Sequence, residues 1–508
     1  MTVLASGPRR VMYKWHSISL VSTSAVSGLL ACIMLAGATS APAQPPAYYV
    51  TAPAVDATAG ADKWLRGIID AVNKGDEAIA SFVAANPNLT TGPGGAPNFL
   101  HHLLLLREKS GGYDLLEVRR SSDSEAVARV RNRLTQNVEQ IFLAVDPSSP
   151  HGFRGFGTER IAGEKPAGFK DDRERVKAIA AYTKRLADAG LFSGVVLVAK
   201  DGKPIFERAY GLADRERHIP NKLDTRFRLG SLNKIFTGLA IGRLVEQGKL
   251  SYDDPLAKFI PDYPDAESAK KIRIKHLLSH TSGLGSFFPP LIHNAQKRGD
   301  VSAGMGVLER RPLEFEPGTK WSYSNTGILL LGRVIELVTG QNYFTYMEQT
   351  MLRPLGLSRT GFPEYDVGAP DLALPYDSVL SSNNKLEAAV PKMRTRWGGP
   401  AGDAASSARD LLRFANALEA GQVVSRDTLR IHSTRKPELG SPRYGYAMSF
   451  DAGERDVYGH GGGAPGTCSQ LSIIRDMPAP YTVVVLGNKS GCREILDKIL
   501  SSIAPVPH

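Results

Sequence analysis

The stretch that most constrains this chain runs from Phe227 to Ala240, where an apolar helix opens with Ser231 and Lys234 three residues apart. On a helix, residues at this spacing share one face. A serine hydroxyl needs a nearby group to take its proton before it can attack a carbonyl. A lysine can do so only if burial or neighbouring positive charge lowers its pKa. The helix N-terminus adds free N–H groups that favour an oxyanion. The same pair also occurs on ordinary surface helices, so the pattern needs support from elsewhere in the chain.

Two later segments give that support. Tyr323-Ser-Asn325 follows a Pro-Gly-Thr turn and precedes an apolar helix. His460 is followed by three glycines, up to Gly463, and two strand-like runs come after them. The chain therefore contains, in this order, Ser-x-x-Lys, Tyr-x-Asn and a basic residue followed by glycines.

This series resembles the catalytic motifs of β-lactamases and penicillin-binding proteins. With tyrosine in the middle motif, it is similar to the branch that holds class C β-lactamases, D-alanyl-D-alanine carboxypeptidases, D-aminopeptidases and related esterases. The likeness begins near Ala187, ends near Ile503, and includes Leu250–Pro255, Leu277–Leu284 and Pro354–Leu357. The resemblance implies an α+β fold, in which an antiparallel sheet is flanked by helices and an all-helical subdomain lies over the active-site cleft.

The resemblance also implies roles for the first two motifs. Ser231 would be the nucleophile that becomes acylated, and Lys234 would exchange protons with it. Tyr323 would be the general base in acylation and, through a water, in deacylation. Its reference pKa is near 10, and we expect the positive charge of Lys234 to lower it. Asn325 would hold the substrate's carbonyl-bearing side chain and contact Lys234.

The glycine segment is expected to complete the site. The oxyanion hole would consist of the backbone N–H groups of Ser231 and Gly463. His460, Gly461 and Gly462 would line a strand edge, where an extended substrate could add main-chain hydrogen bonds.

The histidine is a departure that bears on the substrate. β-Lactamases usually place lysine where this chain has His460, whereas D-amino-acid peptidases and esterases often carry histidine. A neutral imidazole attracts a carboxylate weakly, and Gly461 offers no hydroxyl to bind one. We therefore expect an exported serine hydrolase that acts on an ester or a D-amino-acid amide, with a small-molecule ester, a peptide or a cell-wall fragment as its partner. The alternatives are a class C-like β-lactamase and a penicillin- or cell-wall-binding protein without turnover.

The N-terminus predicts export. Arg9, Arg10 and Lys14 precede a mostly apolar stretch from Ile18 to Ala36, and Ala41-Pro-Ala43 follows as a cleavage site. Residues 1–43 are therefore expected to form a signal peptide, and the protein is expected to be periplasmic or secreted. An uncleaved segment would instead anchor the chain to a membrane. The formal charge is +11, and removing these three basic residues leaves 11 − 3 = +8. No lysine or arginine stripe indicates nucleic-acid binding.

Composition and periodicity divide the rest of the chain. Residues 44–59 form an Ala- and Pro-rich leader, and residues 60–146 form an accessory α+β domain, NTF2-like or cystatin-like by layout, with three helical runs and three strands. This domain would either gate or dock substrate, or serve packing or dimerisation. Residues 147–171 read as a linker, residues 172–508 as the hydrolase domain, and Asp172 as the cap of its first helix.

Two cysteines remain after the signal peptide, Cys468 and Cys492. If the strand-like runs Gln470–Ile474 and Tyr481–Leu486 pair as a hairpin, the cysteines fall near its open end and can form a disulfide. Two buried thiols are the alternative.

We expect neither a metal nor a cofactor. His276 and His280 have helical metal-ligand spacing but lack the glutamate of His-Glu-x-x-His. No Gly-x-Ser-x-Gly elbow indicates an α/β-hydrolase. The walls of the substrate pocket are expected at Phe287, Phe288, Trp397 and the loop near Gly402.

Overall fold

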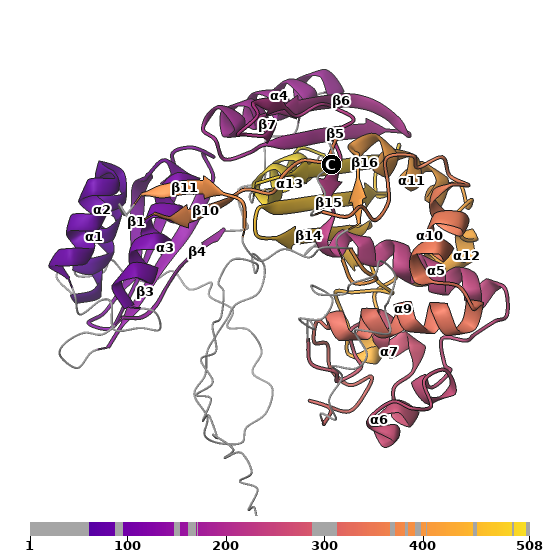
Figure 1. Ribbon diagram of the computed structural model, residues 1–508. Helices are drawn as coiled ribbons and strands as arrows, with labels where there is room; N and C mark the ends of the chain where they lie inside the picture. The colour runs from indigo at the N-terminus through magenta and orange to yellow at the C-terminus, as the bar shows by residue number, and fades with distance from the viewer. Residues whose placement is uncertain are drawn as a thin grey trace, which may run out of the picture. The chain divides into compact units, whose positions relative to one another are not determined.

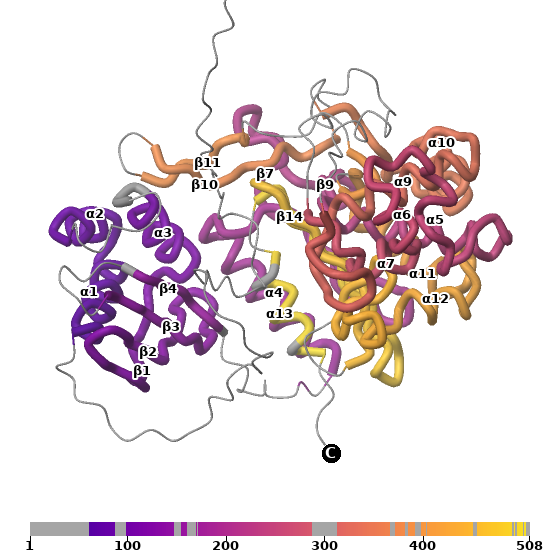
Figure 2. Tube along the Cα trace, turned by 90° about the horizontal axis from the view of Figure 1, so that it is seen from below, coloured from indigo at the N-terminus to yellow at the C-terminus, as the bar shows by residue number. Residues whose placement is uncertain are grey.

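The computed structural model (Figures 1 and 2) describes residues 60–86, 95–146, 153–160, 169, 171–286, 312–365, 371–381, 385–391, 398–402, 404–450, 455–489 and 492–503. The predicted signal peptide (1–43), the leader (44–59) and the pocket residues Phe287, Phe288 and Trp397 lie outside these ranges. Within them, no helix combines the length and the apolar character that crossing a membrane requires.

The accessory domain consists of three helices followed by an antiparallel meander. Its elements are α1 (Gly60–Lys74), α2 (Asp76–Ala85), α3 (Gly95–Ser110), β1 (Tyr113–Ser121), β2 (Glu125–Asn132), β3 (Val138–Val145) and β4 (Phe153–Arg160). The helical spacing of Leu65, Ile68 and Val72 places these side chains in one core with Ala128 and Ile141 of the sheet. The helices and the first three strands follow the sequence prediction.

The fourth strand corrects that prediction. Residues 147–171 were expected to be a linker, but β4 lies inside this segment and pairs with β3, with Ile141 opposite Thr158. The glycines of this segment, among them Gly155 and Gly157, suggested a linker from composition alone. Pairing with an existing strand edge overrides that local preference.

The hydrolase domain is built on a six-stranded antiparallel sheet with the order β13-β14-β15-β16-β5-β6. Its strands are β5 (Gly194–Lys200), β6 (Lys203–Tyr210), β13 (Ser449–Phe450), β14 (Val457–Ala464), β15 (Thr467–Ile474) and β16 (Tyr481–Gly487). Strand β5 from the beginning of the domain pairs with β16 near its end, so Gly194 lies opposite Gly487. Neighbouring strands within the sheet therefore come from segments far apart in the sequence.

Both faces of this sheet are covered. Along β16 the side chains alternate, with Val483 and Val485 in one core and Val484 and Leu486 in the other. The first core is closed by α4 (Asp172–Asp188) and α13 (Cys492–Ser502), which lie side by side (Figure 2). The predicted hairpin of β15 and β16 is present, and a disulfide joins Cys468 to Cys492 across 5.7 Å between Cα atoms.

The cap of α4 differs from the prediction by one residue. Asp171 rather than Asp172 is the N-cap, and its side chain accepts a hydrogen bond from the Glu174 N–H. Asp172 instead pairs with Lys200 at 2.6 Å.

The second core lies under the helical part of the domain. Its larger helices are α5 (Lys234–Glu246), α9 (Asn325–Thr339), α11 (Ala408–Glu419) and α12 (Arg426–His432), and its shorter elements include η3 (Leu256–Lys258), α6 (Ala266–Lys271), α7 (Ile274–Leu278), α10 (Tyr343–Met347), η5 (Glu348–Leu352) and η6 (Pro437–Leu439). Short two-stranded ladders pair β7 (Leu212–Asp214) with β8 (Ile219–Pro220), β9 (Phe227–Arg228) with β12 (Ala405–Ser406), and β10 (Asp377–Leu380) with β11 (Leu386–Ala389).

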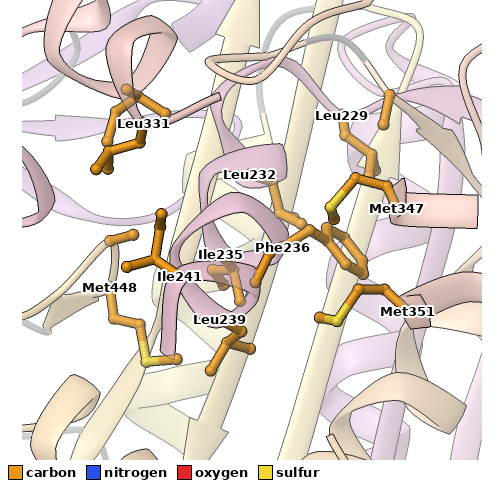
Figure 3. Close-up of a cluster of buried hydrophobic side chains, with 14 of the residues drawn as sticks. Leu229, Leu232, Ile235, Phe236, Leu239, Ile241, Leu331, Met347, Met351 and Met448 are labelled. Carbon is orange, nitrogen blue, oxygen red and sulfur yellow. The ribbon is translucent and has the colours of Figure 1, made fainter. Parts of the chain in front are cut away.

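Helix α5 runs through the middle of this core. All of its residues from Lys234 to Gly242 are buried, among them Ile235, Phe236 and Leu239. Figure 3 shows Met347, Met351 and other apolar side chains around it. A helix enclosed in this way is rigid, and it fixes the residues at its N-terminus.

Candidate active site

Ser231 lies on a single 3-10 turn, η2 (Gly230–Asn233), which runs directly into α5. The turn begins at Gly230 with φ of 49°, in the left-handed region that glycine adopts without a steric penalty. The other three residues of the turn are buried, whereas Ser231 is half-buried. The serine therefore stands on a tight turn ahead of the α-helix, not within its first turn as the sequence suggested.

Lys234 is the first residue of α5, and its side chain is completely buried. Its Nζ donates to Ser231 Oγ at 3.0 Å and to the backbone carbonyl of Ala401. The loop that carries Ala401 is held by Asn233, whose Nδ2 donates to the carbonyl of Gly399 at 2.7 Å. A buried amine needs such acceptors, and they fix Lys234 beside the nucleophile.

Tyr323 completes the cluster. Its hydroxyl donates to Ser231 Oγ at 2.8 Å, and Lys234 Nζ lies 5.0 Å from the centre of its ring. The structure thus brings together the three residues that two distant motifs supplied. Burial raises the pKa of Tyr323 to about 12, and the hydrogen bond with Ser231 acts in the opposite direction. The expectation of a lowered pKa is wrong for this resting arrangement, in which the phenol is protonated at neutral pH.

Asn325 is the first residue of α9. The preceding Ser324 caps the helix by accepting a hydrogen bond from the Gly327 N–H at 3.1 Å. Asn325 Nδ2 donates to Ser286 Oγ at 3.3 Å, whereas its Oδ1 is buried and accepts no hydrogen bond from the described part of the chain. The contact with Lys234 that the resemblance implies is therefore not made through this oxygen. An unpaired buried acceptor costs about 1–3 kcal/mol, so a donor on a bound substrate would be favourable here.

The glycines of β14 bring this strand against the nucleophile turn. A Cβ on Gly462 would lie 1.9 Å from the Leu229 carbonyl oxygen, so only glycine fits at this approach. The backbone nitrogen of Gly463 lies 2.9 Å from the place that a Cβ on Gly230 would take. The two predicted oxyanion donors, the N–H groups of Ser231 and Gly463, therefore belong to segments in direct contact.

His460 does not line an exposed strand edge as expected. Its side chain is 5% exposed, its Nε2 lies 2.8 Å from Tyr444 Oη, and its Nδ1 bonds the Gly461 carbonyl. Because a carbonyl only accepts, Nδ1 carries the proton and Nε2 accepts from the tyrosine. Burial, with Lys234 second, lowers the pKa of His460 to about 3, so the imidazole is neutral. Gly461 remains half-buried in the strand, opposite Gln470.

Three contacts escaped the sequence analysis. The Ala401 carbonyl acts through the backbone, which leaves no mark on a side-chain pattern. Tyr444 lies ahead of β13, in a segment that contains none of the three motifs. His280, considered only as a metal ligand, lies 4.5 Å from the Tyr323 ring. Among the residues that the structure describes, no three histidine, cysteine or carboxylate side chains are grouped as a metal site.

Comparison with known proteins identifies relatives of the hydrolase domain. The family model described as Beta-lactamase matches residues 178–498, which include all three motifs. Among curated proteins, esterase EstB of Burkholderia gladioli is 32% identical over 291 residues, which cover 51% of this chain and 74% of the esterase.

Solved structures agree with this match. A penicillin binding protein from Bacillus halodurans has a TM-score of 0.54 and 27% sequence identity, over 63% of this chain and 98% of its own. A D-stereospecific amidohydrolase from Streptomyces sp. has a TM-score of 0.51 and 27% identity, over 66% of this chain and 100% of its own. The mixed arrangement of antiparallel sheet and helices expected from the motifs is therefore confirmed.

Proposed function

The chain belongs to the beta-lactamase family, and we propose that it is a serine hydrolase that forms an acyl intermediate on Ser231 from an ester or a D-amino-acid amide. One observation carries this proposal: Ser231 Oγ lies 3.0 Å from Lys234 Nζ and 2.8 Å from Tyr323 Oη. A half-buried hydroxyl between a buried amine and a half-buried phenol, both able to exchange protons with it, is the arrangement that nucleophilic catalysis requires.

Acylation needs a free base, and the resting cluster does not hold one on Tyr323. At neutral pH the phenol of Tyr323 is protonated. The reactive form is therefore the one in which the pair of Tyr323 and Lys234 carries one proton fewer than in this resting state. In this form the pair takes the Ser231 proton as Oγ bonds the substrate carbonyl carbon. The same proton then passes to the departing alcohol or amine as its bond to that carbon breaks. In the second half of the cycle, water attacks the acyl-serine and gives its proton to the pair. The pair then returns a proton to Ser231 Oγ as the bond between Oγ and the acyl carbon breaks and the acid is released.

The charge that develops on the carbonyl oxygen would be stabilised by the N–H groups of Ser231 and Gly463. Backbone donors of this kind are worth several kcal/mol in a transition state, about 3–4 for one donor. The close approach of β14 at Gly462 supports this assignment, because it leaves no room for a side chain between the two segments.

His460 and the relatives support the proposed substrate class. The buried, neutral imidazole offers no positive charge to a substrate carboxylate. An ester or an amide without an essential carboxylate therefore fits the site better than a β-lactam drug. Esterase EstB and the D-stereospecific amidohydrolase support the same two substrate classes by their names.

The decisive experiment is labelling of the full chain with a fluorophosphonate, followed by peptide mapping. We expect one modified serine, Ser231, and none in Ser231→Ala. Turnover of a short-chain nitrophenyl ester is then compared with that of a D-amino-acid nitroanilide and of nitrocefin. Nitrocefin as the best substrate would favour the β-lactamase alternative, and labelling without any turnover would favour a binding protein. Modification at another serine refutes the catalytic assignment.

We also propose export with cleavage after Ala43. The disulfide between Cys468 and Cys492 supports an oxidising compartment such as the periplasm or the exterior. Membrane attachment would apply only if residues 1–43 were retained. Mass spectrometry of the mature N-terminus in fractionated cells tests this proposal, and an N-terminus at Met1 in the cytosolic fraction refutes it.

A further inference from the structure

His280 has an unusual backbone conformation for a buried side chain. It follows α7 with φ of 58°, in the left-handed region, and it is 0% exposed. Left-handed conformations are uncommon outside glycine and cost energy unless the surroundings hold them in place. His280 contacts Tyr323, so we looked for the interactions that hold it in this conformation.

These interactions are hydrogen bonds and a ring contact with the segment around Tyr323. Its backbone carbonyl accepts a hydrogen bond from the Ser322 N–H at 2.9 Å, and its Nδ1 accepts one from the Ser324 N–H at 3.2 Å. These two donors are the residues immediately before and after Tyr323. The imidazole also packs on the Tyr323 ring, with 4.5 Å between ring centres. One residue therefore holds Tyr323 by the backbone on both sides and by its ring.

The hydrogen bonds also define the protonation of the imidazole. Because Nδ1 accepts from a backbone N–H, the neutral ring carries its proton on Nε2. Burial lowers the pKa of His280 well below its ordinary value, and the nearby Lys234 and His460 act in the same direction. The ring lies between Tyr323 and Tyr444, 4.5 and 4.7 Å from their ring centres. It stays neutral, and its role is therefore geometric.

We infer that His280 is a positioning residue that fixes Tyr323 Oη against Ser231 Oγ through the two backbone hydrogen bonds that flank the tyrosine. The inference rests on the proposed function. The left-handed conformation is what allows the carbonyl and Nδ1 of one residue to reach both donors.

The test compares two substitutions of nearly equal shape. Asn at position 280 tolerates the left-handed region and keeps an acceptor near the place of Nδ1, whereas Leu removes the acceptor. We expect His280→Leu to lower kcat per active site by about 10²-fold, the effect of an error of about 1 Å in placing a catalytic group. His280→Asn should stay within about tenfold of wild type, because it loses only the ring contact. KM should change little in both variants.

A matched control separates positioning from stability. His432 is also fully buried between two tyrosines, with Nε2 2.9 Å from Tyr252 Oη and Nδ1 3.1 Å from the Tyr446 carbonyl. His432→Leu should lower stability but leave kcat per active site unchanged. Active sites are counted by fluorophosphonate titration, so unfolded protein does not enter kcat. If His280→Leu does not fold, His280→Ala, which also lacks the acceptor, replaces it.

The outcomes separate the inference from the proposed function. The inference that His280 positions Tyr323 is refuted if kcat falls equally in His280→Leu and His280→Asn, or if His280→Leu keeps the wild-type kcat. Labelling at Ser231 would in either case still support the proposed hydrolase function. If wild-type protein is not labelled at Ser231, the proposed function fails. The hydrogen bond from the Ser324 N–H to His280 Nδ1 is then tested by ¹⁵N NMR of the full chain with labelled histidine. The signals of His280 are identified as those that His280→Asn removes, and they should show an unprotonated Nδ1. A protonated Nδ1 there overturns the inference.

Discussion

The close approach of β14 to the nucleophile turn makes Gly462→Ala the most informative single substitution. The added Cβ would lie 1.9 Å from the Leu229 carbonyl oxygen, whereas real Cβ contacts do not fall below 3.0 Å. The strand and the turn must therefore separate by at least 3.0 − 1.9 = 1.1 Å. The oxygen cannot simply rotate away, because it accepts a hydrogen bond from Ser469 Oγ at 2.5 Å.

The magnitude follows from this displacement. Overpacking a well-packed site costs about 1–3 kcal/mol, and a clash with backbone belongs at the upper end, so we expect the free energy of unfolding to fall by about 3 kcal/mol. The same movement separates the Gly463 N–H from Ser231, and an error of about 1 Å in a catalytic arrangement costs about 10²-fold in rate.

Neighbouring glycines give internal controls for stability. Among the residues that the structure describes, a Cβ on Gly463 would meet only the Thr467 carbonyl oxygen, at 3.9 Å, so Gly463→Ala should stay within about 1 kcal/mol of wild type. A Cβ on Gly461 would meet the Oε1 end of the Gln470 side chain at 2.7 Å, which can move, so Gly461→Ala should lie between the two. Urea unfolding followed by circular dichroism measures all three variants. If Gly462→Ala is as stable as Gly463→Ala, the strand does not approach the turn as described.

Further predictions concern proton transfer by Tyr323, stability at acidic pH and the disulfide. Tyr323→Phe should lower kcat by about 10²–10⁴-fold. In wild type, kcat/KM should rise with pH above neutrality, because the raised pKa of Tyr323 keeps the cluster protonated at lower pH; a flat profile from pH 7 to 10 contradicts this mechanism. His460 has a folded-state pKa of about 3, below the unfolded value of 6.5, so its contribution to stability is full above pH 6.5 and is lost as pH falls toward 3. At pH 5 the loss is about 2 kcal/mol; urea titrations from pH 7 to 5 measure it, and His460→Gln should remove this part of the slope. Cys468→Ser opens a loop with a sequence separation of 24 and should cost about 3 kcal/mol, measured against the oxidised wild type; equal stability would show that the bridge with Cys492 contributes nothing.

The sequence indicated the chemistry of the site better than its electrostatics. Ser231, Lys234 and Tyr323 could be named because the motifs that contain them match, in order, the catalytic motifs of a known family. The raised pKa of Tyr323 could not be predicted, because it results from burial by segments distant in the chain. His460 was placed at the substrate edge from the resemblance of its motif, yet its side chain is buried against Tyr444, a contact that no motif encodes.

The fold shows the same division. Local signals predicted helices and the hairpin of β15 and β16, whereas the class of architecture of the hydrolase domain was implied by the family resemblance. Two features could not be derived: the pairing of β5 with β16, and the fourth strand of the accessory domain. Both depend on which strand edge is available for pairing in the folded chain. The Ala401 carbonyl acts through the backbone, and the contacts of His280 join segments distant in the sequence, so composition carries no record of either.

The pairing of Gly194 with Gly487 has a consequence for biogenesis. While the ribosome is still adding the residues before β16, the β5–β6 hairpin has no partner along one side, and the central sheet cannot close. Contacts this distant in sequence slow folding. For the export proposed above, in which the chain would cross a membrane unfolded, this delay would be an advantage, since the sheet that would block passage closes only after almost the entire chain has been synthesised.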